Sequence, residues 1–293
     1  MKIVFANRYY WPDESATSQM LSDLAPALAK HKNVELIVLT SNQLYTDASA
    51  QLLKSETHLK VRIQRLGSTR FGRNNLLGRA IDYLTFYASA FKALRQESHS
   101  ADWIICKTDP PMLHVIGTAA KARSSKAKII AWNQDVFPEI AFAAKNGTGL
   151  TSLIQKLLCG IRNRSLQRCD HVVVLGEDMQ AHFEENGIPP EKLKVLPNWA
   201  DGTLIRPMPA KENPLRQAWE IDKDFVVGYS GNLGRVHDYQ TMLKAACDEA
   251  LPAQTRFLMI GSGALQKKLR EEIPAIARSR FIFSRETGQL GYY

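Results

Sequence analysis

Between Lys2 and Thr40 the chain reads KIVFANRYYWPDESATSQMLSDLAPALAKHKNVELIVLT. An apolar run at Ile3–Ala6 is followed by Ser18–Ala29, where leucine and alanine recur at helical spacing, and then by a second apolar run at Val34–Thr40. This pattern predicts a strand, an amphipathic helix and another strand. Such an order indicates a right-handed crossover between parallel strands, and therefore an α/β fold with helices on both faces of a parallel sheet.

The same alternation continues along the chain. It predicts further strands at Val61–Arg65, Trp103–Cys106, Lys128–Trp132, Val172–Leu175 and Val195–Leu196. The pattern breaks at Pro197, and Pro207, Pro209 and Pro214 follow, which indicates an interdomain connection. It then restarts, with predicted strands at Phe225–Tyr229, Arg256–Ile260 and Phe281–Phe283 and predicted helices at Asp238–Ala246 and Leu265–Glu272.

Two doubly wound, Rossmann-like domains in tandem are therefore expected, at residues 1–200 and 201–293. In such domains ligands bind at the carboxyl ends of the strands. A doubly wound domain usually has about five or six strands. The second domain shows fewer, so we expect it to be incomplete.

The composition restricts the class of partner. Hydrophobic residues make up 45% and charged residues 23% of the 293-residue chain, and the formal net charge is +9. A globular protein with this charge favours anionic partners such as nucleotide phosphates or an acidic membrane surface. No RNP, helix-turn-helix or zinc-finger pattern is present, so nucleic acid is not an expected partner.

The cysteines and histidines indicate neither disulfides nor a metal. The four cysteines show no CxxC pairing, which is typical of reduced thiols in a cytoplasmic protein. The histidines lack the spacing of metal ligands, so we predict no metal site and no cofactor.

A glycine-rich segment, Gly228–Arg235, follows a predicted strand. Backbone amides at such a turn, with a helix behind them, can bind an anion, and an adjacent arginine adds a bidentate phosphate contact. We therefore predict that Gly231, Asn232, Gly234 and Arg235 bind a phosphate. The alternative is that the glycines only permit a tight turn, and this alternative is as strong for Gly261 and Gly263. The spacing GxxGxxG differs from the dinucleotide-binding GxGxxG, which argues against a dehydrogenase.

Two loops at the carboxyl edge of the first predicted sheet carry polar side chains. The loop after the first strand contains Ser15, Ala16, Thr17 and Ser18, and it either lines the ligand cleft or covers the core with its aromatic residues. After another strand, the segment Trp132–Glu139 includes Asn133, Asp135 and Glu139. Asp135 is either an acid–base or hydroxyl-binding group or the cap of the following helix.

Together these segments resemble family 4 of the GT-B glycosyltransferases. The resemblance rests on the opening loop with Leu21–Ala29, on Trp132–Glu139 and on Val172–Met179. Lys194–Asp201 followed by Tyr229–Arg235 is similar to the subgroup that transfers N-acetylfucosamine-type sugars in O-antigen and capsule assembly.

The resemblance implies retaining transfer from a UDP- or GDP-type sugar, without a metal, in the cleft between the two domains. It implies that Asp135 is catalytic and that Asn133 and Glu139 bind substrate. It places the Ser15–Ser18 loop near donor and acceptor, and Gly231, Asn232, Gly234 and Arg235 at the donor phosphates. The acceptor in such pathways is a lipid-linked sugar used for surface polysaccharide, including lipopolysaccharide.

The chain departs from the family pattern in three places. Ala16-Thr17-Ser18 stands where many relatives have two glycines, and Asn232 and His237 stand where many have arginine and lysine. The E-x7-E pair that relatives carry late in the second domain is absent before Tyr293. We therefore expect the chain to be cut short, its second domain to be weakly stable, and the chain to have little or no transferase activity. The alternative is a non-catalytic remnant or a nucleotide-sugar-binding module.

A basic and aromatic segment, Arg62–Arg95, predicts a peripheral membrane face. Seven arginines and lysines alternate there with aromatic and aliphatic residues, and Asp82 is the one acid. Such segments bind anionic lipid through charge and shallow apolar insertion. The alternative is an amphipathic core helix with a solvated basic rim. We expect a cytoplasmic protein on the inner face of the plasma membrane.

Overall fold

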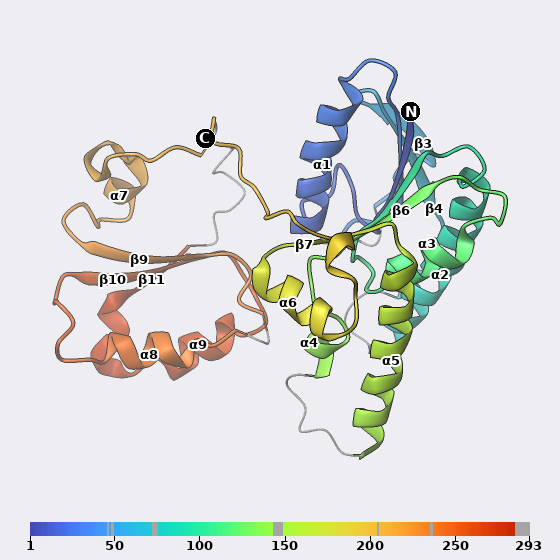
Figure 1. The fold of residues 1–293 in the computed structure, drawn as a ribbon. Coiled ribbons are helices and arrows are strands. Elements are labelled where there is room, and N and C mark those ends of the chain that lie inside the picture. Colours follow the sequence, from blue (N-terminus) through green and yellow to red (C-terminus); the bar gives the residue numbers. More distant parts are fainter. Residues whose placement is uncertain are drawn as a thin grey trace. The chain divides into compact units, whose positions relative to one another are not determined.

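The computed structural model describes residues 1–45, 47, 50–71, 76–142, 149–203, 205–234 and 237–284. The chain divides into two compact units, Met1–Trp199 and Ala200–Tyr293. Each unit contains its own sheet (Figure 1).

The first unit contains an eight-stranded sheet with the order β3-β4-β2-β1-β5-β6-β7-β8. Its strands are β1 (Lys2–Ala6), β2 (Glu35–Ser41), β3 (Ser55–His58), β4 (Val61–Leu66), β5 (Trp103–Cys106), β6 (Lys128–Trp132), β7 (His171–Val174) and β8 (Leu193–Val195). All neighbours pair in parallel except β3 and β4. The sequence reading missed β3 because it has no apolar run: it is an edge strand, SETH, whose side chains are all at least partly exposed.

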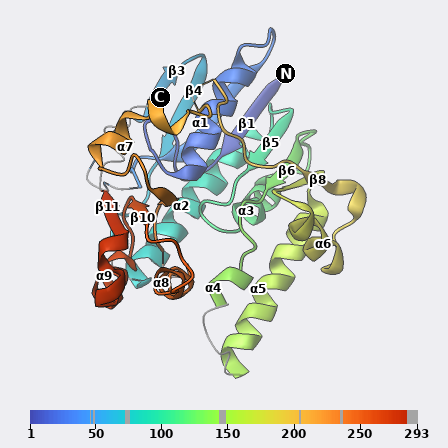
Figure 2. The ribbon, with the colours of Figure 1, turned by 90° about the vertical axis from the view of Figure 1, so that its left-hand side faces the viewer.

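Helices cover both faces of this sheet. They are α1 (Ala16–Ala29), α2 (Leu76–Glu97), α3 (Leu113–Ala120), α4 (Glu139–Phe142), α5 (Gly149–Arg168) and α6 (Glu177–Glu185), with a 3-10 turn η1 (Pro190–Lys192). α5 extends well beyond the sheet (Figure 2). Among the described residues, none of the helices is long and apolar enough to span a bilayer.

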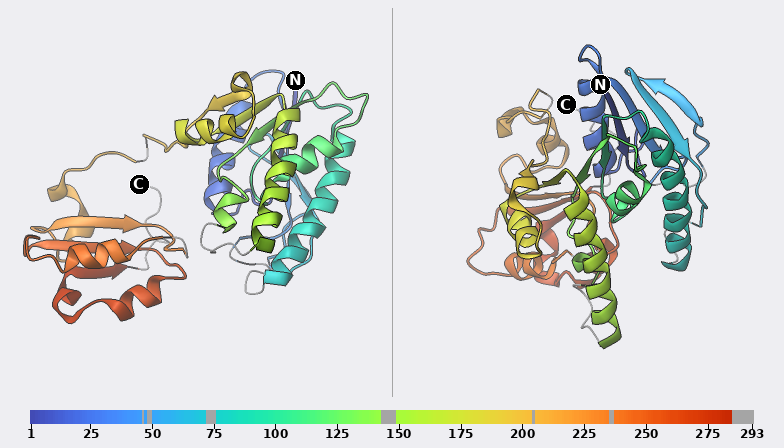
Figure 3. Two further views of the ribbon diagram at one scale, coloured as in Figure 1. Left: turned by 60° about the horizontal axis from the view of Figure 1, so that its bottom comes forward. Right: turned by 45° about the vertical axis from the view of Figure 1, so that its right-hand side comes forward.

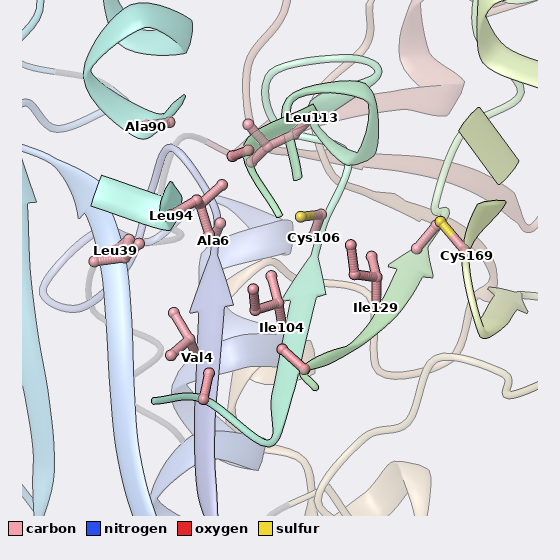
Figure 4. Close-up of a cluster of buried hydrophobic side chains, with 14 of the residues drawn as sticks. Val4, Ala6, Leu39, Ala90, Leu94, Ile104, Cys106, Leu113, Ile129 and Cys169 are labelled. Carbon is pink, nitrogen blue, oxygen red and sulfur yellow. The ribbon is translucent and has the colours of Figure 1, made fainter. Parts of the chain in front are cut away.

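Successive side chains along β1 point to opposite faces of the sheet and so belong to two separate hydrophobic cores. Val4 and Ala6 join the cluster that packs against α2 and α3, which includes Leu94. Figure 4 shows these side chains on one side of the strands. Ile3 and Phe5 point to the opposite cluster with Leu21 of α1 and its neighbours. Because successive strand residues face opposite ways, a sheet that is buried on both faces needs consecutive apolar residues. The predicted doubly wound α/β architecture is confirmed.

The second unit contains a three-stranded parallel sheet with the order β11-β10-β9 (Figure 3). The strands are β9 (Phe225–Ser230), β10 (Thr255–Ile260) and β11 (Phe281–Ser284). The helical segments are η2 (Ala210–Glu212), α7 (Pro214–Ala218), α8 (Gln240–Ala246), α9 (Gln266–Glu272) and η3 (Ala275–Arg280). Its core gathers Leu243 of α8, Leu269 of α9 and Phe257 of β10. On β9, by contrast, Phe225 is 68% exposed.

Candidate functional site

The carboxyl ends of β1, β5 and β6 meet at one edge of the first sheet, because these strands are parallel neighbours. Each of the three is followed by a polar loop. The loops are joined by backbone hydrogen bonds: Lys107 N–H donates to Ala6 O at 3.0 Å, and Arg8 N–H donates to Asp109 O. The loop after β6 is held by Asn133 N–H, which donates to Val173 O at 2.8 Å. The predicted loops therefore lie together at this edge.

The predicted Ser15–Ser18 loop begins α1. Ser15 is the N-cap residue, but its side chain accepts no capping hydrogen bond, and Ala16, Thr17 and Ser18 form the first helical turn. Ser18 Oγ donates to Asp13 O at 2.8 Å. The first-turn amides of a helix have no partner within the helix and carry partial positive charge. Since the family's two glycines are absent, the first turn of α1 is the group at this position that could bind an anion, and this role stays a prediction.

A residue that the sequence reading missed, Lys107, lies at the centre of this edge. Its side chain is buried, and its Nζ donates to Thr17 O at 3.0 Å. The same Nζ lies 4.0 Å from the centre of the Trp132 ring. Burial lowers the pKa of Lys107 to about 7, although nearby Asp109 acts to raise it. A charged residue directly after the apolar strand Trp103–Cys106 was the signal that could have revealed it.

Several buried polar atoms at this edge lack a hydrogen-bond partner within the described part of the chain. They are Asn7 Oδ1, Ser15 Oγ, Thr17 Oγ1, Trp132 Nε1 and Asn133 Nδ2. Native proteins rarely leave such atoms unpaired, and each unpaired buried group costs free energy. We call this set with Lys107 the polar cluster. Donors, acceptors and a cation that gather in one place are typical of a site for a polar, anionic ligand.

Asp135 follows Asn133 on the same loop but caps no helix, because no described residue hydrogen-bonds to its carboxylate and α4 begins only at Glu139. The capping alternative is therefore wrong. The residue is exposed as a whole, yet partial burial of its carboxyl group raises the pKa. A carboxylate with a raised pKa is a better base than an ordinary aspartate.

Glu139, the other predicted carboxylate, is not joined to the polar cluster. It accepts a 2.6 Å hydrogen bond from Arg162 Nη1 and lies 3.1 Å from His182 Nε2. Burial acts to raise the pKa of Glu139, but the hydrogen bonds from Arg162 and His182 and the charge of Arg162 outweigh it, so the pKa is lowered. The structure thus places Glu139 in an ion-pair network between α5 and α6.

Some backbone N–H groups in the glycine turn of the second unit already donate to backbone carbonyl groups of the same unit. Gly231 N–H donates to Ile260 O at 3.0 Å, and Leu233 N–H donates to Ser262 O at 2.7 Å. Gly231 has φ +146°, and a Cβ built there would meet nothing within 4 Å, so open space lies beside it. Asn232 and Gly234 complete the turn, whereas Arg235 lies outside the described residues. Their phosphate-binding role stays a prediction.

The helix after this turn begins later than predicted. α8 starts at Gln240, and the Asp238 carboxylate accepts a 2.9 Å hydrogen bond from Gln240 N–H. An acidic side chain already neutralises this helix start, and the helix is too short to hold an anion by itself.

Gly261 and Gly263 have a structural role. A Cβ at Gly261 would lie 2.4 Å from Gly231 O, and one at Gly263 would lie 2.3 Å from Leu233 O. Both residues also have positive φ, at +115° and +146°. Only glycine lets these two turns approach each other so closely. This supports the tight-turn alternative for both residues.

The basic segment Arg62–Arg95 divides between core and surface. Arg65 is buried and pairs with Glu56, and Phe86 is fully buried in the core. On α2, however, Ile81 is 42%, Leu84 66% and Phe91 41% exposed. The β4 part of the segment belongs to the sheet, while α2 keeps an apolar exposed stripe beside Arg79, Lys92 and Arg95. The membrane face stays a prediction.

Comparison with known proteins gives consistent matches. The family described as Glycosyltransferase Family 4 matches residues 17–203. The probable glycosyltransferase WbjE of Pseudomonas aeruginosa is 27% identical over 204 residues, which are 69% of this chain and 50% of that protein. The chain thus spans about half the length of this curated relative.

Two solved structures share the fold. HepE of Anabaena, solved with UDP-glucose, matches with a TM-score of 0.65 and 19% identity, over 97% of this chain and 68% of that one. Sucrose-phosphate synthase of Thermosynechococcus elongatus matches with a TM-score of 0.73 and 14% identity, over 97% and 70%. At these identities the likeness shows the fold alone.

Proposed function

We propose that this chain, which belongs to glycosyltransferase family 4, transfers a sugar with retention from a UDP- or GDP-type nucleotide sugar. The acceptor in this proposal is a lipid-linked sugar used to build surface polysaccharide at the inner face of the plasma membrane. The observation that carries the proposal is the polar cluster at the carboxyl edge of the first sheet. In parallel α/β folds this edge is where ligands bind.

The charges of the polar cluster suit a reaction that releases a diphosphate. The buried Lys107 is an ammonium below its pKa of about 7, and the first turn of α1 adds the partial positive charge of its free amides. Negative charge that develops on a leaving phosphate is stabilised most by fixed charges in such an environment. Asn7, Thr17 and Asn133 carry unpaired side-chain atoms that are covered in this conformation, and we propose that they bind sugar hydroxyls once the loops at this edge open.

Asp135 is proposed to act on the acceptor. As the bond from the anomeric carbon to the donor diphosphate breaks, the acceptor hydroxyl oxygen bonds to that carbon from the same face. The diphosphate keeps the bonding electrons, and the hydroxyl proton passes to the Asp135 carboxylate. The raised pKa of Asp135 favours this proton transfer.

The donor nucleotide is proposed to bind the glycine turn of the second unit. Gly231 has open space beside it, and Arg235 would add a charge-assisted phosphate contact. The solved complex of HepE with UDP-glucose supports a UDP-type donor, although this relative shares only 19% identity. The sugar of the N-acetylfucosamine type is proposed on the sequence resemblance alone.

Membrane association is proposed through α2, whose exposed apolar stripe adjoins Arg79, Lys92 and Arg95. Apolar insertion together with basic charge binds anionic lipid surfaces. Equal binding to neutral and anionic vesicles at low salt would contradict this part of the proposal.

Two experiments test the function. Calorimetry measures the binding of UDP and GDP, and transfer assays use labelled UDP- and GDP-sugars with membrane lipid extracts as acceptors. We expect nucleotide binding and label in the lipid fraction, with turnover reduced by about 100- to 10,000-fold in Asp135→Asn. Binding without transfer would favour the nucleotide-sugar-binding module. Absence of binding to either nucleotide would refute the proposal.

A further inference from the structure

An apolar pocket of about 430 Å³ lies in the first unit between α2, α3 and α5. Its walls include the aromatic rings of Tyr83, Tyr87 and Phe137, together with Met112, Ile116 and Leu158. This volume falls within the range of about 300–1,000 Å³ that is usual for small-molecule sites. The polar cluster does not include any of these residues.

The pocket arises from a mismatch in helix length. α3 has 8 residues, whereas its neighbours α2 and α5 have 22 and 20. At about 1.5 Å per residue, α3 spans about 12 Å between two helices of about 30 Å or more. α2 and α5 therefore run on past the end of α3 (Figure 3). The short helix forms a floor between two longer walls.

The pocket continues into exposed apolar surface on both walls. On α5, Leu150, Leu153, Ile154, Leu157 and Ile161 are each between 39% and 69% exposed. Residues three or four apart lie on the same helix face, so the pocket residue Leu158 adjoins Ile154 and Ile161. On α2 the pocket residue Ala80 adjoins exposed Leu84 in the same way. A long apolar chain could follow this surface after leaving the pocket.

Basic charge accompanies the apolar surface. Arg79 lines the pocket. α5 contains Lys156, Arg164 and Arg168, besides the buried Arg162 that pairs with Glu139, and it has no acidic residue. An apolar pocket with a guanidinium at its wall suits a ligand that has an apolar chain and a phosphate.

The pocket also adjoins the loops of the proposed transfer site. The Arg8 guanidinium, on the loop after β1, lies 4.9 Å from the centre of the Tyr83 ring in the pocket wall. Phe137, another wall residue, is two positions beyond Asp135 on one loop. A ligand that is bound in the pocket would therefore hold its head group near the carboxyl edge of the sheet.

We propose that this pocket holds the first part of the single apolar chain of an isoprenyl phosphate, the lipid of the lipid-linked acceptor. This inference rests on the proposed function for the identity of the acceptor. One pocket of this size accommodates one chain, which favours an isoprenyl phosphate over a lipid with two acyl chains. Arg79 contacts the phosphate, and the rest of the chain lies along the α2 and α5 stripes.

Farnesyl phosphate, used below its micelle-forming concentration, is the probe, and calorimetry without vesicles measures its binding. Ala80→Trp fills the pocket from an exposed position, so we expect binding about tenfold weaker or worse. Ala88→Trp is the matched control, since Ala88 is exposed on the same helix and does not line the pocket. Arg79→Gln should weaken farnesyl phosphate binding about tenfold but leave farnesol binding unchanged, whereas Arg95→Gln should change neither.

Several results would overturn the proposal. Equal farnesyl phosphate binding by Ala80→Trp and Ala88→Trp would exclude the pocket. Binding that requires vesicles and is lost in Leu84→Ser and Leu153→Ser would show a bilayer contact instead. Tighter binding of a short diacyl phosphatidic acid than of farnesyl phosphate would show that the pocket holds a lipid with two chains. If the protein does not bind farnesyl phosphate but dimerises at higher concentration, and Ala80→Trp abolishes this dimerisation, the pocket is filled by a second copy of the chain.

The same measurements separate this proposal from the proposed function. If the wild-type chain binds farnesyl phosphate but neither UDP nor GDP, the pocket is supported and the transferase function fails. If the chain transfers sugar to a water-soluble acceptor while the probe does not bind, the function stands and the pocket proposal fails. A far-UV circular dichroism spectrum and a thermal midpoint of Ala80→Trp that match those of Ala88→Trp show that the first unit of the variant is folded.

Discussion

Both units are built from alternating strands and helices, but they differ in how much of each sheet is buried. In the first unit β1 sends Ile3 and Phe5 to one core and Val4 and Ala6 to another, and all four are buried. In the second unit β9 keeps Phe225 68% and Val227 39% exposed. Burial of apolar surface is the main source of stability in a folded chain. The comparison indicates that the first unit is the more stable one.

The largest expected effect tests this difference with one pair of substitutions. Phe5→Ala removes a fully buried ring and should lower the free energy of unfolding of the first unit by about 3–5 kcal/mol. Phe225→Ala removes an exposed ring and should change stability by no more than about 0.5 kcal/mol. Denaturant unfolding measures both, and similar losses for the two variants would contradict the comparison.

The first unit contains a buried lysine, Lys107, whereas the described core of the second unit contains no buried cationic side chain. The next prediction concerns this lysine. Lys107→Met should reduce sugar transfer by about 100-fold, because one preorganised charge at a developing anion is worth roughly that much. Its stability should not fall, since a buried charge is removed. Lys107→Arg keeps the charge and should retain more activity than Lys107→Met. Unchanged turnover in Lys107→Met would remove this residue from the site.

The lowered pKa of Lys107 also predicts a pH dependence. Between about pH 7 and the ordinary lysine value of 10.5 the unfolded chain binds the proton and the folded chain does not. Stability should therefore rise with pH across that window, by at most about 1.4 kcal/mol per pH unit. Thermal unfolding of the wild type against Lys107→Met at pH 7 to 10 measures it. Parallel profiles for the two proteins would mean that Lys107 does not titrate there.

In the second unit the close approach of two turns can be tested in the same way. Gly263→Ala would bring a Cβ within 2.3 Å of Leu233 O at a positive φ, and should cost about 1–3 kcal/mol. Gly231→Ala also has a positive φ but meets open space, so it should cost less and chiefly affect nucleotide binding. If Gly231→Ala proved the more destabilising of the two, the assignment of roles to these glycines would be reversed.

An effect of similar size concerns the ion pair of Glu139 with Arg162. Because this interaction lowers the pKa of Glu139, its stabilisation is present above the usual glutamate pKa and is lost as the pH falls through the folded value. Glu139→Gln should lower stability at pH 7 by about 1–3 kcal/mol and by less at acidic pH. A uniform loss at every pH would show that the charge is not responsible.

Apolar spacing alone determined most of the fold. Trp103–Cys106 and Lys128–Trp132 were predicted with the bounds that the structure has. β4, β9, β10 and β11 were predicted with a shift of one residue at one end, and β2 with a shift of one residue at both ends. Strands that are buried on both faces require consecutive apolar residues, so they are visible in the sequence. β3 was missed because an edge strand with exposed side chains has no such requirement.

The candidate site was predicted only in part. The loops that hold Thr17, Asn133 and Asp135 follow directly from the rule that parallel strands end at one edge. Lys107 and the pairing of Glu139 with Arg162 and His182 do not follow from any local pattern, because each partner comes from a different element of the sheet or its helices.

By itself, therefore, the sequence determined the strands, the parallel sheets and the edge at which polar side chains gather, because these depend on residue spacing along one chain. The tertiary structure decided which of those side chains are buried, paired or left without a partner. Only the tertiary structure shows that Lys107 contacts Thr17 O and the Trp132 ring, and that the short α3 leaves an apolar pocket between α2 and α5. Burial and charge depend on neighbours that are distant in sequence, and only the packed fold brings them together.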